Sequence, residues 1–265
     1  MTAVLLRTAA SAHMGRMMQL NMPHGIIARL GPCTSRLHMA AGAKGASAAV
    51  QQKIPQFKDH AEMTAALLAL TGDPLEPAGG RIVVYRGDPQ AKLMVVGEAP
   101  GAMEDETGKP FVGRSGQLLD AILKAAGFDP ETDLYVSNIV RRRPPENRDP
   151  TTAEIAYYRP WLLEEIRLVN PAIIITTGRW SMRAVLNERR GITKVRGQWY
   201  APGTTPDLPA ATWAMPWFHP SYLLRNPTKD EGGPKWLTWV DAQEVRRKYD
   251  ELLGASFLAV DDSAS

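Results

Sequence analysis

The chain has 265 residues, of which 44% are hydrophobic and 22% are charged, a composition typical of a globular protein rather than a disordered or fibrous one. No apolar run approaches the roughly 18 residues of a membrane span, so we expect no membrane partner. A single cysteine, Cys33, excludes a disulfide within one chain and any metal site built only of cysteines, and the net charge of +3 is a weak sign of a nucleic-acid partner.

All of the positive balance lies in the first 58 residues. This segment holds seven of the 31 Lys and Arg residues and no Asp or Glu, so the rest of the chain has 24 basic against 28 acidic residues, a net charge of −4. An acid-poor leader that carries arginines is typical of an organelle transit peptide. The alternative is a misassigned start, with translation beginning near Met39. We therefore expect residues 1–58 to be a transit peptide or a disordered leader.

From Asp59 onward, helical and extended patterns alternate. The sequence predicts helices over residues 60–70, 115–126, 151–168, 179–187 and 236–252. It predicts strands over residues 81–85, 92–96, 134–140, 172–177, 194–200 and 213–218. This order predicts a three-layer α/β/α sandwich with a mostly parallel central sheet, in which Pro160 bends the third helix. The domain would span residues 59–254, and residues 255–265 would form a flexible tail.

The first loop to consider follows the strand 92–96, because ligands of such sheets bind beyond the carboxyl ends of the strands. It reads GEAPGAMEDETGKPFVG, with glycines that allow close backbone approach. Its three consecutive acids, residues 104–106, suit water or proton handling better than phosphate binding. The missing GxGxxG pattern disfavours a dinucleotide site. Taken alone, Glu98 also fits a helix-capping role, and Phe111 also fits the core.

The second loop follows the strand 134–140. The strand carries Asn138, whose amide has a donor and an acceptor that match the O4 and N3–H groups of uracil. The alternative is an asparagine that fixes a neighbouring loop. Four arginines follow on a proline-stiffened segment and predict a phosphate-binding surface, unless they are simply solvated. They are Arg141, Arg142, Arg143 and Arg148.

The third loop begins with His219 and follows the last predicted strand. An imidazole at this position is suited to stabilise charge that develops on a base oxygen, although a His before Pro is often only a turn residue. Leu223, Leu224 and Arg225 then predict a wedge that enters a base stack.

Taken in order, the three loops resemble those of family 4 uracil-DNA glycosylases. The matching stretches are GEAPGAMEDETGKPFVGRSGQLL, SNIVRRRPPENRDPT and WFHPSYLLRNP, and the resemblance covers roughly residues 81–252. It implies a monomeric hydrolase that removes uracil from single- or double-stranded DNA and leaves an abasic site. The alternatives are a uracil- or abasic-DNA-binding protein without turnover, and a structural protein or oxidoreductase, which the missing dinucleotide motif disfavours. Likeness to cyanobacterial members favours a chloroplast location over the mitochondrion, or the cytoplasm if the start is misassigned.

The resemblance also implies a role for each site residue. The residues expected to catalyse are Glu98, Glu104 and Asn147, which would position water, and His219, which would bind O2 of the base. The residues expected to hold the base are Ala99, Phe111 and Asn138. The residues expected to contact DNA are Gly101, Gly113, Arg143, Arg148, Ser221, Leu224 and Arg225. Since only Lys109 falls within the motif cores, a Schiff-base lyase is not indicated.

The sequence departs from the family at the iron–sulfur site. The resemblance implies a [4Fe–4S] cluster on four cysteines, but Arg142 and Tyr158 occupy two of those positions and residues 69–80 contain no cysteine. We therefore expect no cluster and no other cofactor. In its place we expect a cation–π pair between Arg142 and Tyr158, supported by apolar packing near Leu75 and Trp161.

Overall fold

The computed structural model describes residues 56–261, and the side chains of residues 56–254. The predicted leader, residues 1–58, therefore lies almost wholly outside the described residues, as does the end of the predicted tail. Everything described below belongs to one compact unit, Ala48–Ser265.

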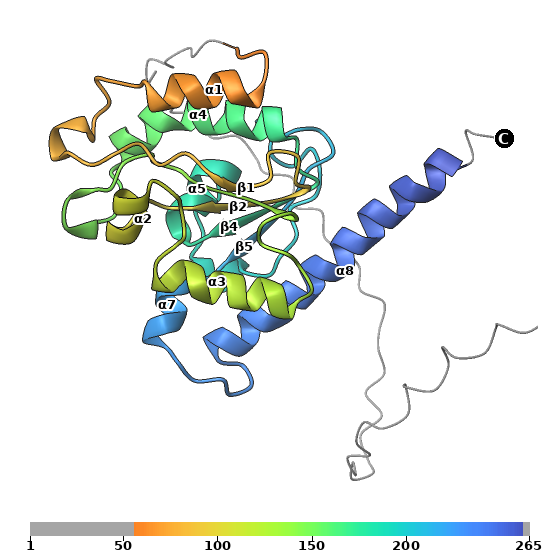
Figure 1. Cartoon of the computed structure of the whole chain (residues 1–265). Coiled ribbons are helices and arrows are strands. Elements are labelled where there is room, and N and C mark those ends of the chain that lie inside the picture. Colours follow the sequence, from red (N-terminus) through yellow and green to blue (C-terminus); the bar gives the residue numbers. More distant parts are fainter. Residues whose placement is uncertain (1–55, 262–265) are drawn as a thin grey trace, which may run out of the picture. The chain divides into compact units, whose positions relative to one another are not determined.

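The centre of the fold is a five-stranded sheet with the order β1–β3–β2–β4–β5 (Figure 1). Four strands are parallel: β2 (Leu93–Gly97), β3 (Leu134–Asn138), β4 (Ile173–Thr177) and β5 (Trp213–Trp217). The short edge strand β1 (Arg86–Gly87) is antiparallel to β3. The mostly parallel sheet predicted from the sequence is therefore confirmed.

Helices cover both faces of the sheet (Figure 1). One face carries α4 (Thr152–Val169) and α5 (Arg179–Leu186), with α1 (His60–Leu68) packed beside α4. The other face carries α3 (Arg114–Ala125) and α8 (Pro234–Asp261). This arrangement is the predicted α/β/α sandwich, and α8 runs beyond its predicted end at residue 252.

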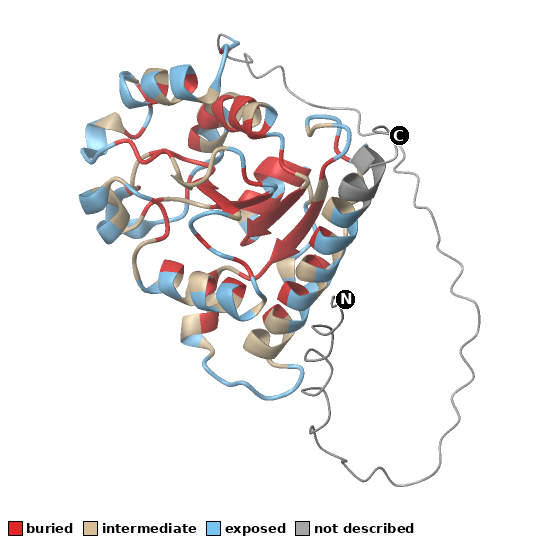
Figure 2. Cartoon of the chain, turned by 45° about the vertical axis from the view of Figure 1, so that its right-hand side comes forward, coloured by how far each residue is buried: buried red, intermediate tan, exposed pale blue. Residues whose placement is uncertain are grey.

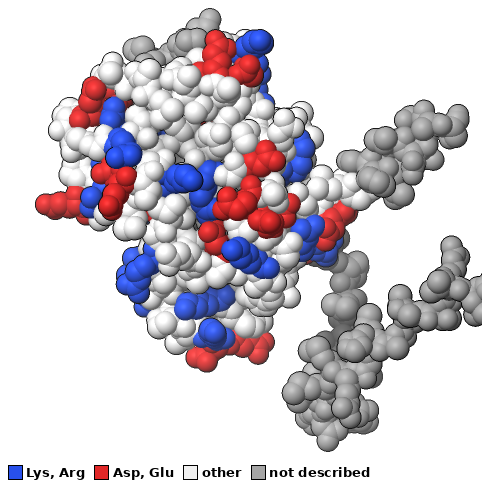
Figure 3. All heavy atoms as spheres, viewed as in Figure 1, with Lys and Arg blue, Asp and Glu red and all other residues white. Residues whose placement is uncertain are grey.

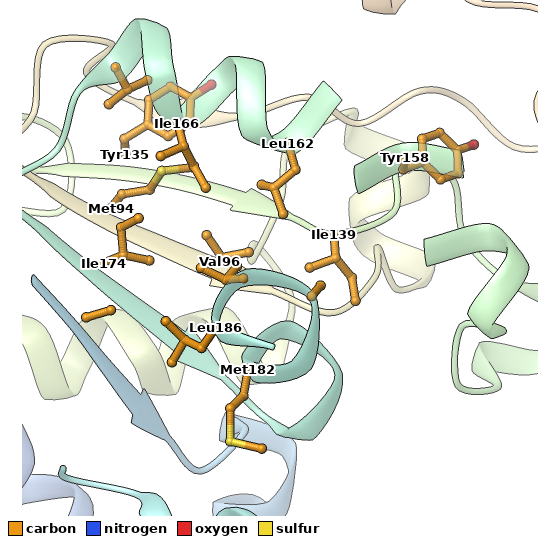
Figure 4. Packing of buried hydrophobic residues seen from close by; sticks show 14 of the residues in the cluster. Met94, Val96, Tyr135, Ile139, Tyr158, Leu162, Ile166, Ile174, Met182 and Leu186 are labelled. Carbon is orange, nitrogen blue, oxygen red and sulfur yellow. The ribbon is translucent and has the colours of Figure 1, made fainter. Parts of the chain in front are cut away.

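Alternate side chains of each strand point into the two halves of the core. In β2, Met94 and Val96 pack with α4 and α5, whereas Leu93 and Val95 pack with α3 and α8. Figure 4 shows the first cluster, in which Tyr158 lies at the margin with its hydroxyl turned away from the sheet residues. Figure 2 shows buried strands between helices whose outer surfaces are exposed. A strand that is covered on both faces needs a continuous apolar run, which is why KLMVV predicts it correctly.

Two predicted strands are wrong. Residues 81–85 are buried in part but join no ladder: the N–H of Val83 donates to the carbonyl of Arg141 at 2.8 Å, and the carbonyl of Val84 accepts from the side chain of Arg141 at 3.0 Å. Residues 194–200 contain the end of a short helix, α6 (Ile192–Val195), and only Tyr200 bridges to β5. In both segments apolar residues are buried by packing against side chains rather than by strand pairing.

The loops at the carboxyl ends of the strands contain short helices that the sequence did not predict. In the first loop α2 (Ala102–Thr107) forms, and in the third loop α7 (Pro220–Arg225) forms. Two 3₁₀ turns, η1 (Glu76–Ala78) and η2 (Pro145–Asn147), lie before β1 and in the second loop. The bend predicted at Pro160, which lies inside α4, stays a prediction.

One face of the molecule carries charges of both signs. Figure 3 shows Lys and Arg side chains interspersed with Asp and Glu over the visible side. None of the helices within residues 56–261 combines the length and the apolar character needed to cross a bilayer. Because charges of both signs are interspersed on the face shown in Figure 3, the attraction of a polyanion to this face depends on where individual cations lie.

Candidate active site

A cavity of about 790 Å³ lies beyond the carboxyl ends of the parallel strands, where the three loops meet the first turn of α5. Ten of the fourteen site residues predicted from the sequence line it. They are Glu98, Ala99, Gly101, Glu104, Phe111, Asn147, Arg148, His219, Ser221 and Arg225. The other four are Gly113, Asn138, Arg143 and Leu224. The cavity has the size of a small-ligand site, large enough for a flipped nucleotide.

The imidazole of His219 is held as a hydrogen-bond donor. His219 is the N-cap of α7, and its Nδ1 accepts from the backbone N–H of Ser221 at 3.1 Å, with the Ser221 hydroxyl 2.8 Å from the same nitrogen. Burial lowers the pKa of His219 to about 4, and the charge of Arg225 adds to this effect. The ring is therefore neutral at physiological pH with its proton on Nε2, which is left free to donate to a ligand in the cavity.

Glu98 is the carboxylate at the end of β2. Its Oε1 accepts from the backbone N–H of Trp180 in the first turn of α5 at 2.9 Å. Burial raises the pKa of Glu98 to about 7 despite this hydrogen bond, and the nearby Asp149 contributes to the rise. A carboxylate with a pKa near 7 is suited to accept a proton from water. The capping role and the catalytic role, alternatives in the sequence, therefore fit the same side chain.

The carboxylate of Glu104 is enclosed by backbone amides. Oε1 accepts from the N–H groups of Val112 (3.0 Å) and Gly113 (2.9 Å), and Oε2 accepts from that of Gly101 (3.1 Å). Gly101 and Gly113 were expected to contact DNA, but here their N–H groups donate to Glu104. An ionised carboxylate satisfies several amides at once, so Glu104 closes the first loop.

Phe111, which lines the cavity, and the buried Asn138 converge on Gly97. A Cβ placed on Gly97 would lie 2.3 Å from Asn138 Oδ1 and 2.3 Å from the Phe111 ring, so only glycine fits between them. Asn138, the partner of Gly97 in the β2–β3 register, is 1% exposed, and within the described residues its Oδ1 has no hydrogen-bond partner. An orphaned buried acceptor beside an aromatic ring indicates a ligand that donates a hydrogen bond.

The turn that carries Phe111 is strained. Phe111 has a φ of +55°, which side chains rarely adopt, and its carbonyl oxygen would lie only 1.7 Å from a Cβ on Gly116. The missing side chain at Gly116 therefore lets the turn lie against α3. This contact holds the ring of Phe111 in the lining of the cavity.

The arginines of the second loop point in different directions. Arg141 is fully buried in an ion pair with Glu165, so it contributes nothing to a DNA-binding surface. Arg143 donates to Asn147 Oδ1 at 2.8 Å and thereby fixes the residue expected to position water. Arg148 is held by Glu154 through both terminal nitrogens, at 2.9 and 2.6 Å, which compensates its charge.

The third loop places only part of the predicted wedge at the surface. Leu223 is fully buried, Leu224 is half-buried, and Arg225 is exposed at the rim of the cavity. Because Leu223 anchors α7 in the core, any wedge consists of Leu224 and Arg225.

The predicted cation–π pair between Arg142 and Tyr158 is wrong. No such contact joins them among the described residues, and both instead bind the buried carboxylate of Asp73. Arg142 Nε donates to Asp73 Oδ2 at 2.7 Å, the Tyr158 hydroxyl donates to Oδ1, and the N–H of Leu75 donates to Oδ1 at 3.1 Å. Arg142 also donates to the carbonyl of Gly80 at 2.6 Å. We call Asp73, Arg142 and Tyr158 the Asp73 network.

The residues at these positions do not fit a [4Fe–4S] cluster, which needs four thiolate ligands. Arg142 and Tyr158 act as hydrogen-bond donors and supply no thiolate. Nor do three or more His, Cys, Asp or Glu side chains gather into a metal-binding group anywhere in the described part of the chain.

Sequence reasoning missed one wall of the cavity, formed by Asp149, Arg179, Ile192 and Thr193. Arg179 lies two residues after the end of β4, so the rule that ligands bind beyond the carboxyl ends of strands also applies to it. The missed signal was therefore the carboxyl end of β4, which is followed by no acidic or histidine motif.

Comparison with known proteins agrees with this geometry. Residues 84–243, which include all three loops, match the model of the uracil DNA glycosylase superfamily. The chain is similar to a type-4 uracil-DNA glycosylase of Thermotoga maritima, at 40% identity over 157 residues that cover 59% of this chain and 78% of that protein. It is also similar to a type-4 enzyme of Pyrobaculum aerophilum, at 35% identity over 158 residues (58% and 79%), and to a type-5 uracil-DNA glycosylase of Mycobacterium leprae, at 34% over 162 residues (55% and 70%). With a match that spans more than half of its length and every loop of the cavity, the chain belongs to the uracil-DNA glycosylase superfamily.

Proposed function

We propose that the protein is a monofunctional uracil-DNA glycosylase, which hydrolyses the bond between a flipped uracil and its deoxyribose and leaves an abasic site. The observation that carries this proposal is the pairing, in one cavity, of a neutral His219 that donates through Nε2 with a Glu98 whose pKa is about 7. Its similarity to type-4 and type-5 uracil-DNA glycosylases supports the same reaction.

Base recognition would depend on Phe111 and Asn138. A base in a duplex must leave the stack before its glycosidic bond is accessible, at a cost of a few kcal/mol. The unpartnered Oδ1 of Asn138 would accept from N3–H of uracil while the amide nitrogen donates to O4. Phe111, which lies over the same glycine, would stack on the base.

Bond cleavage would depend on His219 and Glu98. When the C1′–N1 bond breaks, its electron pair stays on uracil and the sugar becomes cationic. The Nε2–H of His219 stabilises the negative charge that collects on O2, a preorganised interaction of the oxyanion-hole type. A water adds to C1′ and gives its proton to Glu98, while uracil leaves as an anion and is protonated by solvent. Asn147, fixed by Arg143, would orient that water.

The test is a glycosylase assay on the full chain. A labelled oligonucleotide with one uracil, single-stranded or paired with G or A, is incubated with the protein and then treated with alkali to cleave abasic sites. We expect strand cleavage at uracil and none in the matched thymine oligonucleotide. Tight binding without cleavage would instead indicate a non-catalytic uracil-binding protein.

We propose further that the protein works without an iron–sulfur cluster. In its place, the Asp73 network would hold together the segments in which the family resemblance puts the cysteines. Asp73 precedes η1, Arg142 lies in the second loop and Tyr158 lies in α4, so the network joins three segments around one buried carboxylate. Active protein purified without oxygen should contain no iron and show no visible absorption of a cluster. About four irons per chain would contradict this.

We propose in addition that residues 1–58 direct the protein to an organelle and that the protein is a monomer. The acid-poor composition of residues 1–58 supports a targeting leader, with the chloroplast as the first expected destination and the mitochondrion as the second. A fluorescent protein fused to residues 1–58 should enter the organelle, whereas a fusion to residues 59–254 should not. Light scattering of the purified protein should give the mass of a monomer.

A further inference from the structure

An exposed arginine emerges next to the two proposed catalytic side chains. Arg179 is the first residue of α5 and lines the cavity. The preceding Gly178, with a φ of +94°, touches both: a Cβ there would lie 2.4 Å from Glu98 Oε1 and 3.2 Å from His219 Cβ. The guanidinium of Arg179 is therefore a cation at the mouth of the catalytic cavity, and neither the three loop motifs nor the chemistry above gives it a role.

The carboxylate that pairs with this guanidinium is exposed and replaceable. The guanidinium donates to Asp149 Oδ2 at 2.5 Å and lies 4.9 Å from the centre of the Trp180 ring. Both members of the ion pair leave 55% of their side chains exposed. Such a pair contributes little stability, because water solvates the separated charges almost as well.

Arg148, which also lines the cavity, shows the contrast. Its partner Glu154 is 7% exposed and also accepts from the backbone N–H of Thr151 at 2.7 Å, so separating that pair leaves a largely buried charge. Arg148 therefore has a structural role as the partner of Glu154, whereas Arg179 can exchange Asp149 for another anion. An arginine matches the oxygens of a phosphate as well as those of a carboxylate.

We propose that Arg179 binds a backbone phosphate of the DNA strand beside the flipped nucleotide, and that Asp149 holds the guanidinium in position until the phosphate displaces it. This inference rests on the proposed function, since it assigns a DNA contact to the same cavity. Asp149 orients Arg179 in the free protein but also competes with DNA for it, and we expect the competition to have the larger effect on affinity.

The chain provides a matched control in Arg183. It lies in the same helix, is exposed, and its guanidinium lies 5.2 Å from the same Trp180 ring, but it is not among the residues that line the cavity. Arg183→Gln therefore removes the same charge from the same helix. Any difference in DNA affinity between the two variants therefore results from the position of Arg179 at the cavity.

The experiment measures the affinity of the full chain for a single-stranded oligonucleotide that contains 2′-fluoroarabino-uracil, whose fluorine suppresses cleavage. Arg179→Gln should raise Kd about 5- to 20-fold and reduce the slope of log K against log salt by about 0.7, as expected for the loss of one phosphate contact. Arg183→Gln should stay within about 2-fold of the wild type. Asp149→Asn should lower Kd a few-fold, and this gain should vanish in the Arg179→Gln background.

Two results would overturn the proposal. One is equal affinity of Arg179→Gln and Arg183→Gln. The other is weaker binding by Asp149→Asn, because a purely structural ion pair would lose function when either partner is removed. Thermal unfolding of each variant is compared with that of the wild type, so that a folding defect is recognised.

Cleavage of a normal uracil oligonucleotide is measured in parallel. If the wild type binds DNA without cleaving it, the proposed function fails, while the affinities still decide the role of Arg179.

Discussion

Two arginine–carboxylate pairs in this fold share their chemistry and differ in their surroundings. Arg141 and Glu165 have no exposed side-chain surface, are joined at 2.6 Å, and Glu165 also accepts from two hydroxyl groups. Arg179 and Asp149 are joined at 2.5 Å but are more than half exposed. The first pair links β3, the second loop and α4, whereas the second pair lies beside the cavity.

The difference shows how one pair of residue types serves either structure or binding. A buried pair must keep its partners, because a single buried charge cannot be solvated. An exposed pair is free to exchange them. Stability should therefore depend on the buried networks, and activity on the groups of the cavity. The following predictions test this division, from the largest expected effect to the smallest.

Glu165→Ala should lower the free energy of unfolding by about 3–5 kcal/mol, because it leaves Arg141 buried without its counter-charge. Denaturant unfolding measures this loss. The double variant Arg141→Leu, Glu165→Leu removes both charges and should recover at least half of the stability. If Glu165→Ala costs no more than about 0.5 kcal/mol, the buried pair has no structural role.

His219→Ala should reduce kcat for uracil removal by about 10²- to 10³-fold, since it deletes one preorganised donor to the developing anion. Its free energy of unfolding should fall by only about 1 kcal/mol, because the imidazole faces the cavity and its structural role is to cap the short helix α7. Single-turnover cleavage separates this effect from product release. A loss of stability as large as that of Glu165→Ala would contradict the division proposed above.

Glu98→Gln should abolish the dependence of cleavage on a group that titrates near pH 7. In the wild type, cleavage should rise as the pH increases through about 7, because only the carboxylate accepts the proton of water. His219, with a pKa of about 4, should add no limb above pH 5. A pH profile of single-turnover rates measures both.

The same substitution also gives a test on stability, which should fall in the wild type as the pH rises, whereas cleavage should rise. Burial raises the pKa of Glu98 from 4.5 to about 7, so the folded protein binds the proton more tightly than the unfolded chain and the wild type loses stability as the pH rises through this window. Relative to the wild type, Glu98→Gln should therefore be more stable at pH 8 than at pH 4, by on the order of 1–3 kcal/mol. Identical pH dependence of unfolding in the two proteins would show that Glu98 is not buried as described.

Asp73→Asn should cost about 1–3 kcal/mol, because the amide removes the charge that Arg142 needs and turns one acceptor into a donor. Tyr158→Phe, which deletes one hydrogen bond of the same network, should cost about 1 kcal/mol. Denaturant unfolding of both variants, with iron content as a second readout, measures the effect. If both variants match the wild type, the Asp73 network is not the structural replacement for a cluster.

The sequence predicts the layers and the cavity of this fold well, for identifiable reasons. The run KLMVV and the loop that follows it predict β2 and Glu98, because a strand covered on both faces leaves an unmistakable pattern. The run RIVVY is similarly apolar but forms no strand, and its hydrogen bonds go to one residue instead of a ladder: the N–H of Val83 donates to the carbonyl of Arg141 and the carbonyl of Val84 accepts from the side chain of Arg141. Side-chain direction is also hidden: consecutive arginines at 141 and 142 read alike, yet one binds Glu165 and the other Asp73.

The register of β2 and β3 has a consequence for behaviour on heating. Asn138 pairs directly with Gly97 inside a fully buried ladder, so its amide moves only if the centre of the sheet opens. At the rim of the cavity, by contrast, the side chains of Arg179 and Arg225 are exposed, and we expect such groups to lose their order at lower free energy than the buried sheet. We therefore expect discrimination between uracil and cytosine, which differ at the two groups that the Asn138 amide would contact, to persist up to global unfolding, while affinity for DNA declines at lower temperature. Parallel temperature series of cleavage specificity and of Kd would show whether the two decline together or apart.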